Sequence, residues 1–202
     1  MLNWLVYLQP DRPRGTPYRW TAASRAIYHV ITSFINRGDD ILEFGSSTGH
    51  ISYQLAKQDY KITLLDIRKE TVVQTQEIFV RNSATASFIH QDIFLHNQKY
   101  DFAWNSGLIQ CFEDDRKEEL IANLSHITGK LLLFYPDTDH PGKIRGRDSR
   151  VVPGVEGAKE YGVSAIPQIL FRYFDELYWG TLIPEKLKLS YPIQWVLARK
   201  GL

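Results

Sequence analysis

The stretch DDILEFGSSTGHISYQLA, residues 39–56, changes its pattern at the centre. It begins with the apolar run of a short buried strand, turns on Gly45 and Gly49, and continues with the periodicity of an amphipathic helix. Glycine lets a backbone approach a ligand closely and adopt a positive φ. A carboxylate, Glu43, lies just before the turn. The stretch therefore predicts a strand–turn–helix unit whose turn either binds a ligand or is only structural.

Strand and helix patterns alternate along most of the chain. The predicted helices cover residues 21–36, 49–58, 69–82, 114–127 and 164–178. The predicted strands cover residues 41–44, 61–67, 85–92, 100–106, 129–136, 186–192 and 193–202. This alternation predicts an α/β fold with a doubly wound, mostly parallel sheet and helices on both faces. The last two strands are joined by a tight link and pair most simply as a C-terminal antiparallel hairpin.

The length of 202 residues fits one domain with a sizeable core. Prolines interrupt residues 1–20, which we predict to be an irregular N-terminal arm. Residues 21–202 are predicted to form the single domain. Its insertion, at about residues 136–163, is rich in glycine, proline and charge, and loops of this length are usually functional or disordered. We expect this insertion to close over a bound substrate.

Composition restricts the function classes. The formal net charge of +1 gives no reason to expect nucleic acid or an anionic membrane as a partner. Cys111 is the only cysteine, so no intramolecular disulfide can form, which favours a reducing compartment. No apolar run is long enough for a membrane span, and the N-terminal residues lack the pattern of a signal peptide. We expect a cytoplasmic protein that acts on a small molecule, with an oligomeric state that these features leave open.

Polar residues stand at the ends of the next predicted strands. Asp66 follows Gly45 by about 20 residues, a position from which a carboxylate can accept both ribose hydroxyls of an adenosine-containing cofactor. Asp92 can accept a hydrogen bond from the exocyclic amine of adenine, while Ile93 packs on the ring. Asn105 ends the fourth strand. Because ligands of doubly wound sheets bind at the carboxyl ends of the strands, we expect these residues to lie together.

The motifs ILEFGSSTGH, LLDI, QDIF, YDFAWNSGLIQCFEDD and GKLLLFYPD, in this order, resemble the class I (Rossmann-like) S-adenosylmethionine-dependent methyltransferases. The resemblance runs from about residue 21 to the end. It implies a seven-stranded sheet whose last strand is inserted antiparallel, and methyl transfer from S-adenosyl-L-methionine. It places the cofactor's methionine part at Glu43, Gly45, Ser46 and Gly49, its ribose at Asp66, its adenine at Asp92 and Ile93, and its amino group at the Asn105 backbone. Ile67, beside Asp66, is also expected to bind the cofactor.

One residue departs from the family pattern. Where the family usually has a glycine, this chain has Ser47, whose side chain stands at the closest backbone approach. A methyltransferase-like protein that binds the cofactor without turnover therefore stays open as an alternative. A third alternative is an NAD-type oxidoreductase. The missing G-x-G-x-x-G motif and the position of Asp92 count against it.

Methyl transfer mainly requires alignment and exclusion of water, and it needs a base only if the acceptor loses a proton. His140 and Asp137, in YPDTDHPGK after the fifth strand, are the candidates to hold the acceptor or to act as base. Asp139 would complete an oxygen-rich metal site with them, although no metal is predicted. The predicted acceptor-binding residues are Arg145, Arg147, Tyr18 and Arg19. The arginines favour a small acceptor with a carboxylate or phosphate group.

Overall fold

The structure is a computed structural model that describes residues 20–136, 163–182 and 192–201. The strands are β1 (Asp40–Phe44), β2 (Lys61–Asp66), β3 (Ser87–His90), β4 (Phe102–Ser106), β5 (Lys130–Pro136), β6 (Glu176–Leu182) and β7 (Ile193–Arg199). The helices are α1 (Ala22–Thr32), α2 (His50–Ala56), α3 (Lys69–Arg81), α4 (Asp114–Ile127) and α5 (Ile166–Leu170), with the short 3-10 helices η2 (Ile93–Leu95) and η3 (Ile109–Cys111).

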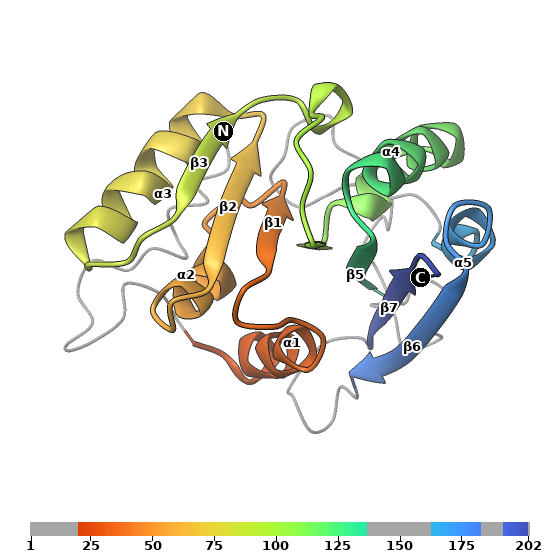
Figure 1. The fold of residues 1–202 in the computed structure, drawn as a ribbon, viewed down its shortest axis with the longest axis horizontal. Helices are drawn as coiled ribbons and strands as arrows, with labels where there is room; N and C mark the ends of the chain where they lie inside the picture. Colours follow the sequence, from red (N-terminus) through yellow and green to blue (C-terminus); the bar gives the residue numbers. More distant parts are fainter. Residues whose placement is uncertain (1–19, 137–162, 183–191, 202) are drawn as a thin grey trace, which may run out of the picture.

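The strands form one seven-stranded sheet in the order β3-β2-β1-β4-β5-β7-β6, with helices on both faces (Figure 1). β1 pairs in parallel with both β2 and β4, so the strand order reverses at β1. β7 pairs antiparallel with both of its neighbours, β5 and β6, whereas the other described strand pairs are parallel. The predicted fold class, with seven strands and one antiparallel insertion, is confirmed. The reversal at β1 leaves a crevice at the carboxyl ends of the strands, where doubly wound sheets bind their ligands.

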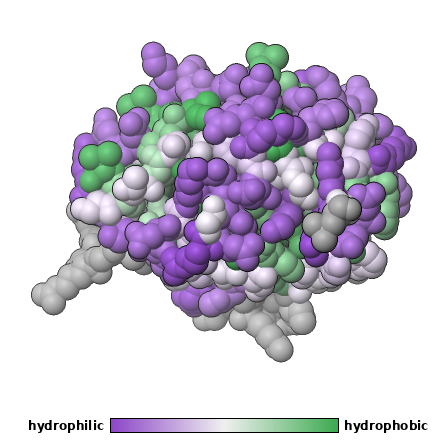
Figure 2. Space-filling model, viewed as in Figure 1, coloured by the Kyte–Doolittle hydropathy of each residue, from purple (hydrophilic) through white to green (hydrophobic). Residues whose placement is uncertain are grey.

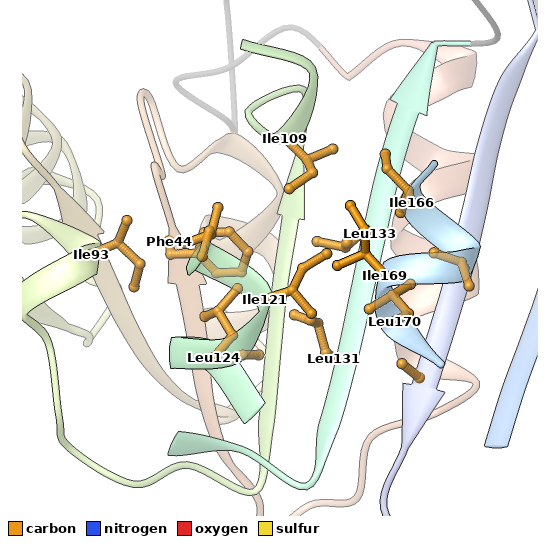
Figure 3. Close-up of a cluster of buried hydrophobic side chains, with 14 of the residues drawn as sticks. Phe44, Ile93, Ile109, Ile121, Leu124, Leu131, Leu133, Ile166, Ile169 and Leu170 are labelled. Atoms are coloured by element: carbon orange, nitrogen blue, oxygen red, sulfur yellow. The ribbon is translucent and has the colours of Figure 1, made fainter. Parts of the chain in front are cut away.

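Two apolar clusters hold the helices to the sheet. The first lies between the sheet and α4 and α5. Figure 3 shows its labelled members: Phe44, Ile93, Ile109, Ile121, Leu124, Leu131, Leu133, Ile166, Ile169 and Leu170. The second lies on the other face, where Ile31 of α1, Leu55 of α2 and Phe79 of α3 pack against β-strand residues such as Trp104. The rigid centre of the sheet therefore fixes the ends of β1, β2 and β4, from which the polar site residues project.

The C-terminal part departs from the prediction. The predicted helix at residues 164–178 is wrong in extent, because α5 ends at Leu170 and the chain enters β6 at Glu176. The β6 sequence ELYWGTL is rich in residues that fit a pleated surface, such as Tyr178 and Trp179. This local preference, together with pairing to β7, overrides the helical spacing of the apolar residues.

The C-terminal antiparallel pair exists, but it is not the tight hairpin that was predicted. Leu182 at the end of β6 stands opposite Ile193 at the start of β7, so a longer connection joins the two strands. The predicted strand at residues 186–192 falls outside the described residues except for Pro192, which belongs to no strand.

The first helix is shorter than predicted. The helix predicted for residues 21–36 ends at Thr32, although Ile35 still packs into the second apolar cluster.

The predicted N-terminal arm (1–20) and insertion (136–163) lie almost wholly outside the described residues, so both boundaries stay predictions. None of the helices in the described ranges is both long and apolar enough to cross a bilayer. In the view of Figure 2, hydrophilic side chains cover most of the surface and apolar side chains are scattered among them.

Candidate functional site

A cavity of about 460 Å³ lies at the carboxyl ends of β1, β2, β3 and β4. Five of the predicted cofactor residues line it: Gly45, Asp66, Ile67, Asp92 and Ile93. Further lining residues that the sequence analysis did not assign are Arg68, Gln91, Phe94, Leu108, Phe112 and Arg116. Arg68, Gln91, Phe94 and Leu108 come one or two residues after a strand end or an assigned carboxylate, and this position was the signal that could have identified them. Phe112 and Arg116 have no such position.

The two glycines of the turn after β1 serve different purposes. Gly45 has φ +59° and lines the cavity, and a Cβ there would lie 2.7 Å from Leu108 Cδ2 on the opposite wall. Gly49 has φ +61° and is not a lining residue. A Cβ at Gly49 would collide with Leu64 of β2 and approach Thr75 of α3 to 3.2 Å. Gly45 therefore shapes the cavity, whereas Gly49 lets the start of α2 pack against β2 and α3.

Ser47 also adopts the left-handed conformation, with φ 47°, and lines the cavity. Its N–H donates to Asp66 Oδ2 at 2.9 Å, and its C=O accepts from Thr75 Oγ1 at 3.0 Å. Hydrogen bonds from two other elements thus hold the backbone of Ser47 in the conformation that a glycine would adopt easily. The departure from the family pattern leaves the shape of the turn intact.

We expect Ser47→Gly to stabilise the protein slightly. A left-handed conformation costs an L-residue about 1–2 kcal/mol, and glycine avoids this cost. The greater conformational freedom of glycine in the unfolded chain destabilises the variant by about 0.4–1 kcal/mol, which offsets part of the gain. The net gain should stay near or below about 1 kcal/mol, measured as the free energy of unfolding in urea. The neighbouring Ser46→Gly is the matched control, because Ser46 is not among the positive-φ residues and should lose stability. A destabilised Ser47→Gly variant would contradict this account of the turn.

Asp66 is the most heavily hydrogen-bonded carboxylate of the cavity. Its side chain is only 3% exposed and accepts from two backbone N–H groups, those of Ser47 and Arg68, at 2.9 Å each. The Arg68 guanidinium adds two bonds of 3.1 Å, from Nε to Oδ1 and from Nη2 to Oδ2. These contacts hold the carboxylate at the end of β2, where a ribose is predicted to bind, and tie it to the glycine turn.

The adenine end of the predicted site is built by the segment after β3. Asp92 Oδ1 accepts from the N–H of Phe94 at 3.0 Å, which begins η2 and fixes the carboxylate. Gln91 beside it is held by His96, whose Nδ1 lies 2.7 Å from Gln91 Oε1. His96 Nε2 lies 3.1 Å from the Tyr100 hydroxyl, and burial lowers the pKa of His96. The neutral ring can therefore donate to Gln91 and accept from Tyr100, which fixes a polar amide in the cavity wall.

Aromatic and apolar groups form the opposite wall. Phe94 and Phe112 make an edge-to-face contact with ring centroids 5.5 Å apart. The Arg116 guanidinium lies over the Phe94 ring, 3.8 Å from its centroid. Together with Leu108 and Ile93, these side chains offer flat apolar surface beside the carboxylate of Asp92. Such a combination suits a planar ring that also carries an amino group.

Glu43 lies behind the turn rather than in the cavity wall. It stands in β1 between Leu64 of β2 and Trp104 of β4, and burial raises the pKa of Glu43 to about 8, with a smaller contribution from the negative charge of Asp66. The carboxyl therefore carries a proton at neutral pH. Within the described residues, Glu43 Oε2, Ser52 Oγ and Trp104 Nε1 make no hydrogen bond. The predicted attraction between Glu43 and a cationic cofactor would require the carboxyl to lose this proton.

Asn105 and Ser46 are also absent from the cavity wall. The Asn105 side chain is buried, donates from Nδ2 to the C=O of Phe44 at 2.6 Å, and accepts at Oδ1 from the N–H of Leu108 at 2.8 Å. Asn105 thus ties the end of β1 to the turn after β4 and positions Leu108 over Gly45. Its side chain has a structural task, and the predicted role of its backbone toward a cofactor stays a prediction.

The predicted catalytic and acceptor-binding residues lie outside the described residues: Asp137, His140, Arg145, Arg147, Tyr18 and Arg19. Asp139, considered as a metal ligand, lies there too. Across the part of the chain that the structure describes, no three His, Cys, Asp or Glu side chains gather as a metal site. The arrangement of the described residues can bind and orient an adenosine-like ligand.

A comparison with protein-family models finds a match to the family described as "Methyltransferase domain" over residues 41–130. The matched segment runs from β1 to the first residue of β5 and contains all described residues of the cavity. No curated protein sequence matches the chain.

Solved structures share the fold. Magnesium protoporphyrin IX methyltransferase from Synechocystis PCC 6803, with bound S-adenosylmethionine, is 15% identical with a TM-score of 0.70, covering 89% of this chain and 78% of that chain. A protein from Pyrococcus horikoshii OT3 is 14% identical with a TM-score of 0.71, covering 89% and 90%. An S-adenosylmethionine-dependent methyltransferase from Methanosarcina mazei is 19% identical with a TM-score of 0.64, covering 86% and 97%. At these identities the likeness concerns the fold.

Proposed function

We propose that the chain is a class I S-adenosylmethionine-dependent methyltransferase, which binds S-adenosyl-L-methionine in the cavity and transfers a methyl group to a small acceptor molecule. One observation carries the proposal. The carboxylates of Asp66 and Asp92 share a single cavity with the turn at Gly45, at the point where the strand order reverses. The order and spacing of these three groups suit a ligand with a polar tail, a ribose and an adenine.

The residues of the cavity fit such a ligand in size and chemistry. A volume of about 460 Å³ lies within the range of small-molecule sites. Asp66 accepts hydrogen bonds at the place proposed for the ribose, and Asp92 Oδ2 makes no hydrogen bond within the described ranges, so it is available to the adenine amine. Ile93 and Leu108 supply apolar surface for the adenine ring. We propose that Ser46, Gly49 and Asn105 support the turn and the strand end from behind.

The cofactor supplies an electrophilic methyl group on a sulfonium centre. The chain contributes orientation and exclusion of water, since an in-line displacement needs an aligned nucleophile more than it needs a particular catalytic side chain. A rigid sheet end suits this task, because the hydrogen bonds of Asp66 and Asn105 fix the cavity walls relative to each other.

We propose that the acceptor is a small molecule and that it carries a carboxylate or phosphate group. The support is the sequence: Arg145 and Arg147 follow β5 in the chain, Arg19 precedes α1, and the net charge of +1 gives no general attraction to nucleic acid. His140 and Asp137 remain the proposed groups for holding the acceptor or removing its proton. These assignments rest on chain position alone.

The alternative of a binding protein without turnover rested on Ser47. The hydrogen bonds of Ser47 to Asp66 and Thr75 favour an intact turn and hence the active alternative. An NAD-type oxidoreductase is not supported, because the family match concerns methyltransferases and the chain has no G-x-G-x-x-G motif.

Two measurements test the proposal. S-adenosylhomocysteine should raise the melting temperature of the purified protein while NAD does not, since only a ligand of the native state stabilises it. Radiolabelled methyl groups should then pass from S-adenosylmethionine to members of a panel of small carboxylates and phosphates. Binding without any transfer would favour the non-catalytic alternative, and stabilisation by NAD alone would overturn the cofactor assignment.

A further inference from the structure

The Asp66 carboxylate already has a full set of hydrogen-bond donors. A carboxylate offers about four acceptor sites, and four N–H groups occupy them: the backbone N–H groups of Ser47 and Arg68, at 2.9 Å each, and the Nε and Nη2 groups of the Arg68 side chain, at 3.1 Å each. The two hydroxyls of a ribose therefore cannot both bind Asp66 while all four donors remain. At least some of the present donors must leave.

The guanidinium is the donor that a side-chain rotation can carry away from Asp66. The N–H of Ser47 is fixed by a turn whose carbonyl is also held by Thr75, and the N–H of Arg68 is fixed at the start of α3. The Arg68 side chain, by contrast, carries its donors at the end of a long chain and is 40% exposed, whereas the Asp66 side chain is 3% exposed. Arg68 itself lines the cavity. The guanidinium thus stands between the carboxylate and the ligand space.

We infer that the Arg68 guanidinium holds the place of the ribose hydroxyls in the cofactor-free protein, and that cofactor and guanidinium exchange on Asp66. This inference rests on the proposed function, because it concerns the ribose end of the same cavity. The exchange lowers the affinity for any ligand with that ribose, including the product S-adenosylhomocysteine. Arg68 therefore assists product release, a step that limits turnover in many enzymes.

If the exchange occurs, an Arg68 substitution should change the stability of the free protein and its affinity for S-adenosylhomocysteine in opposite directions. In the free protein the guanidinium compensates a buried carboxylate, so its removal should lower the melting temperature. The same removal frees the carboxylate for the ribose, so the affinity for S-adenosylhomocysteine should rise. A purely structural role predicts that stability and affinity fall together. The sign of the affinity change therefore decides between the two roles.

Arg68→Met tests the exchange, because methionine keeps an unbranched apolar side chain and removes the guanidinium. Calorimetry should show S-adenosylhomocysteine binding on the order of tenfold more tightly than to the parent protein, since two charge-assisted hydrogen bonds no longer have to be broken. Its dissociation rate should fall by a similar factor. Arg81→Met is the matched control: Arg81 lies at the other end of α3, pairs with Glu77 and is not a lining residue. It removes the same charge and should leave the affinity unchanged.

Adenosine and 2′,3′-dideoxyadenosine identify the ribose hydroxyls as the exchanging groups. Arg68→Met should strengthen the binding of adenosine and leave that of the dideoxy compound unchanged. Equal gains for both, or weaker binding of S-adenosylhomocysteine, would overturn the inference. If Arg68→Met does not fold, Arg68→Lys keeps a charge but cannot form the forked pair, and a smaller gain in affinity is expected. Failure of the parent protein to bind S-adenosylhomocysteine at all would instead refute the proposed function.

Discussion

Replacing Asp66 by alanine is expected to weaken the binding of S-adenosylhomocysteine by about 10- to 100-fold. Hydrogen bonds to a charged group contribute about 1.5–3 kcal/mol, and each 1.4 kcal/mol is a factor of ten in affinity. The proposed exchange with Arg68 reduces the net loss, because the parent protein breaks existing bonds to Asp66 when it binds the ribose. The substitution also removes the acceptor of the Ser47 N–H, so the turn over the cavity loses an anchor.

Titration calorimetry measures this loss, and circular dichroism should show that the variant is folded. Glu77→Ala is the control, because Glu77 is an exposed carboxylate on α3 that lies away from the cavity and whose removal changes the net charge equally. A folded Asp66→Ala protein with the affinity of the parent would refute the ribose assignment. The prediction concerns the cofactor alone, so it needs no knowledge of the acceptor.

The strand ends were predictable because a local sequence pattern marks them: an apolar run is followed by a polar residue or a glycine. Asp66 ends the buried apolar strand β2, and Asp92 follows the short strand β3 by two residues. The carboxyl ends of parallel strands meet at one edge of a sheet. The turn at Gly45 was predictable for the same reason. Residues farther from the strand ends, such as Phe112 and Arg116, have no such local signal. Their place in the cavity depends on how two loops pack across the crevice, which the sequence pattern does not encode.

The partners of a predicted residue could not be foreseen either. Sequence position assigned Asp66 to the ribose, yet the structure reveals that Arg68 already engages its carboxylate. Likewise Asn105 was correctly placed at the end of β4, but its side chain bonds to the strand beside it. In the C-terminal part, pairing between β6 and β7 decided the structure of residues 176–178 against their helical spacing. Each of these outcomes depends on long-range contacts.

Glu43 gives the second large prediction, a loss of stability as the pH rises toward 8. Burial raises the pKa of Glu43 from 4.5 to about 8 in the folded protein. Between these values the native state keeps the proton that the unfolded chain has released. The native state then binds more protons than the unfolded chain, so the free energy of unfolding falls with rising pH, by up to about 1.4 kcal/mol per pH unit. The contribution is complete below pH 4.5 and lost above about pH 8.

His50 acts in the opposite direction over part of this range. Burial lowers the pKa of His50 from 6.5 to about 4, so between these values the unfolded chain binds the extra proton and stability rises with pH. The two slopes oppose each other below pH 6.5. Above pH 6.5, His50 no longer contributes, and only Glu43 makes the stability depend on pH. Between pH 6.5 and 8, the free energy of unfolding should therefore fall by on the order of 2 kcal/mol.

Glu43→Gln should remove this fall, because an amide of nearly the same shape stays neutral at every pH. The variant should be more stable than the parent above pH 8, where the parent must bury a charge whose desolvation outweighs the compensation that Ser52 offers. Urea unfolding at several pH values from 5 to 9 measures both profiles. Glu77→Gln, at an exposed site on α3, should keep the profile of the parent. Parallel profiles of Glu43→Gln and the parent protein would mean that Glu43 is already ionised at neutral pH and would overturn its raised pKa.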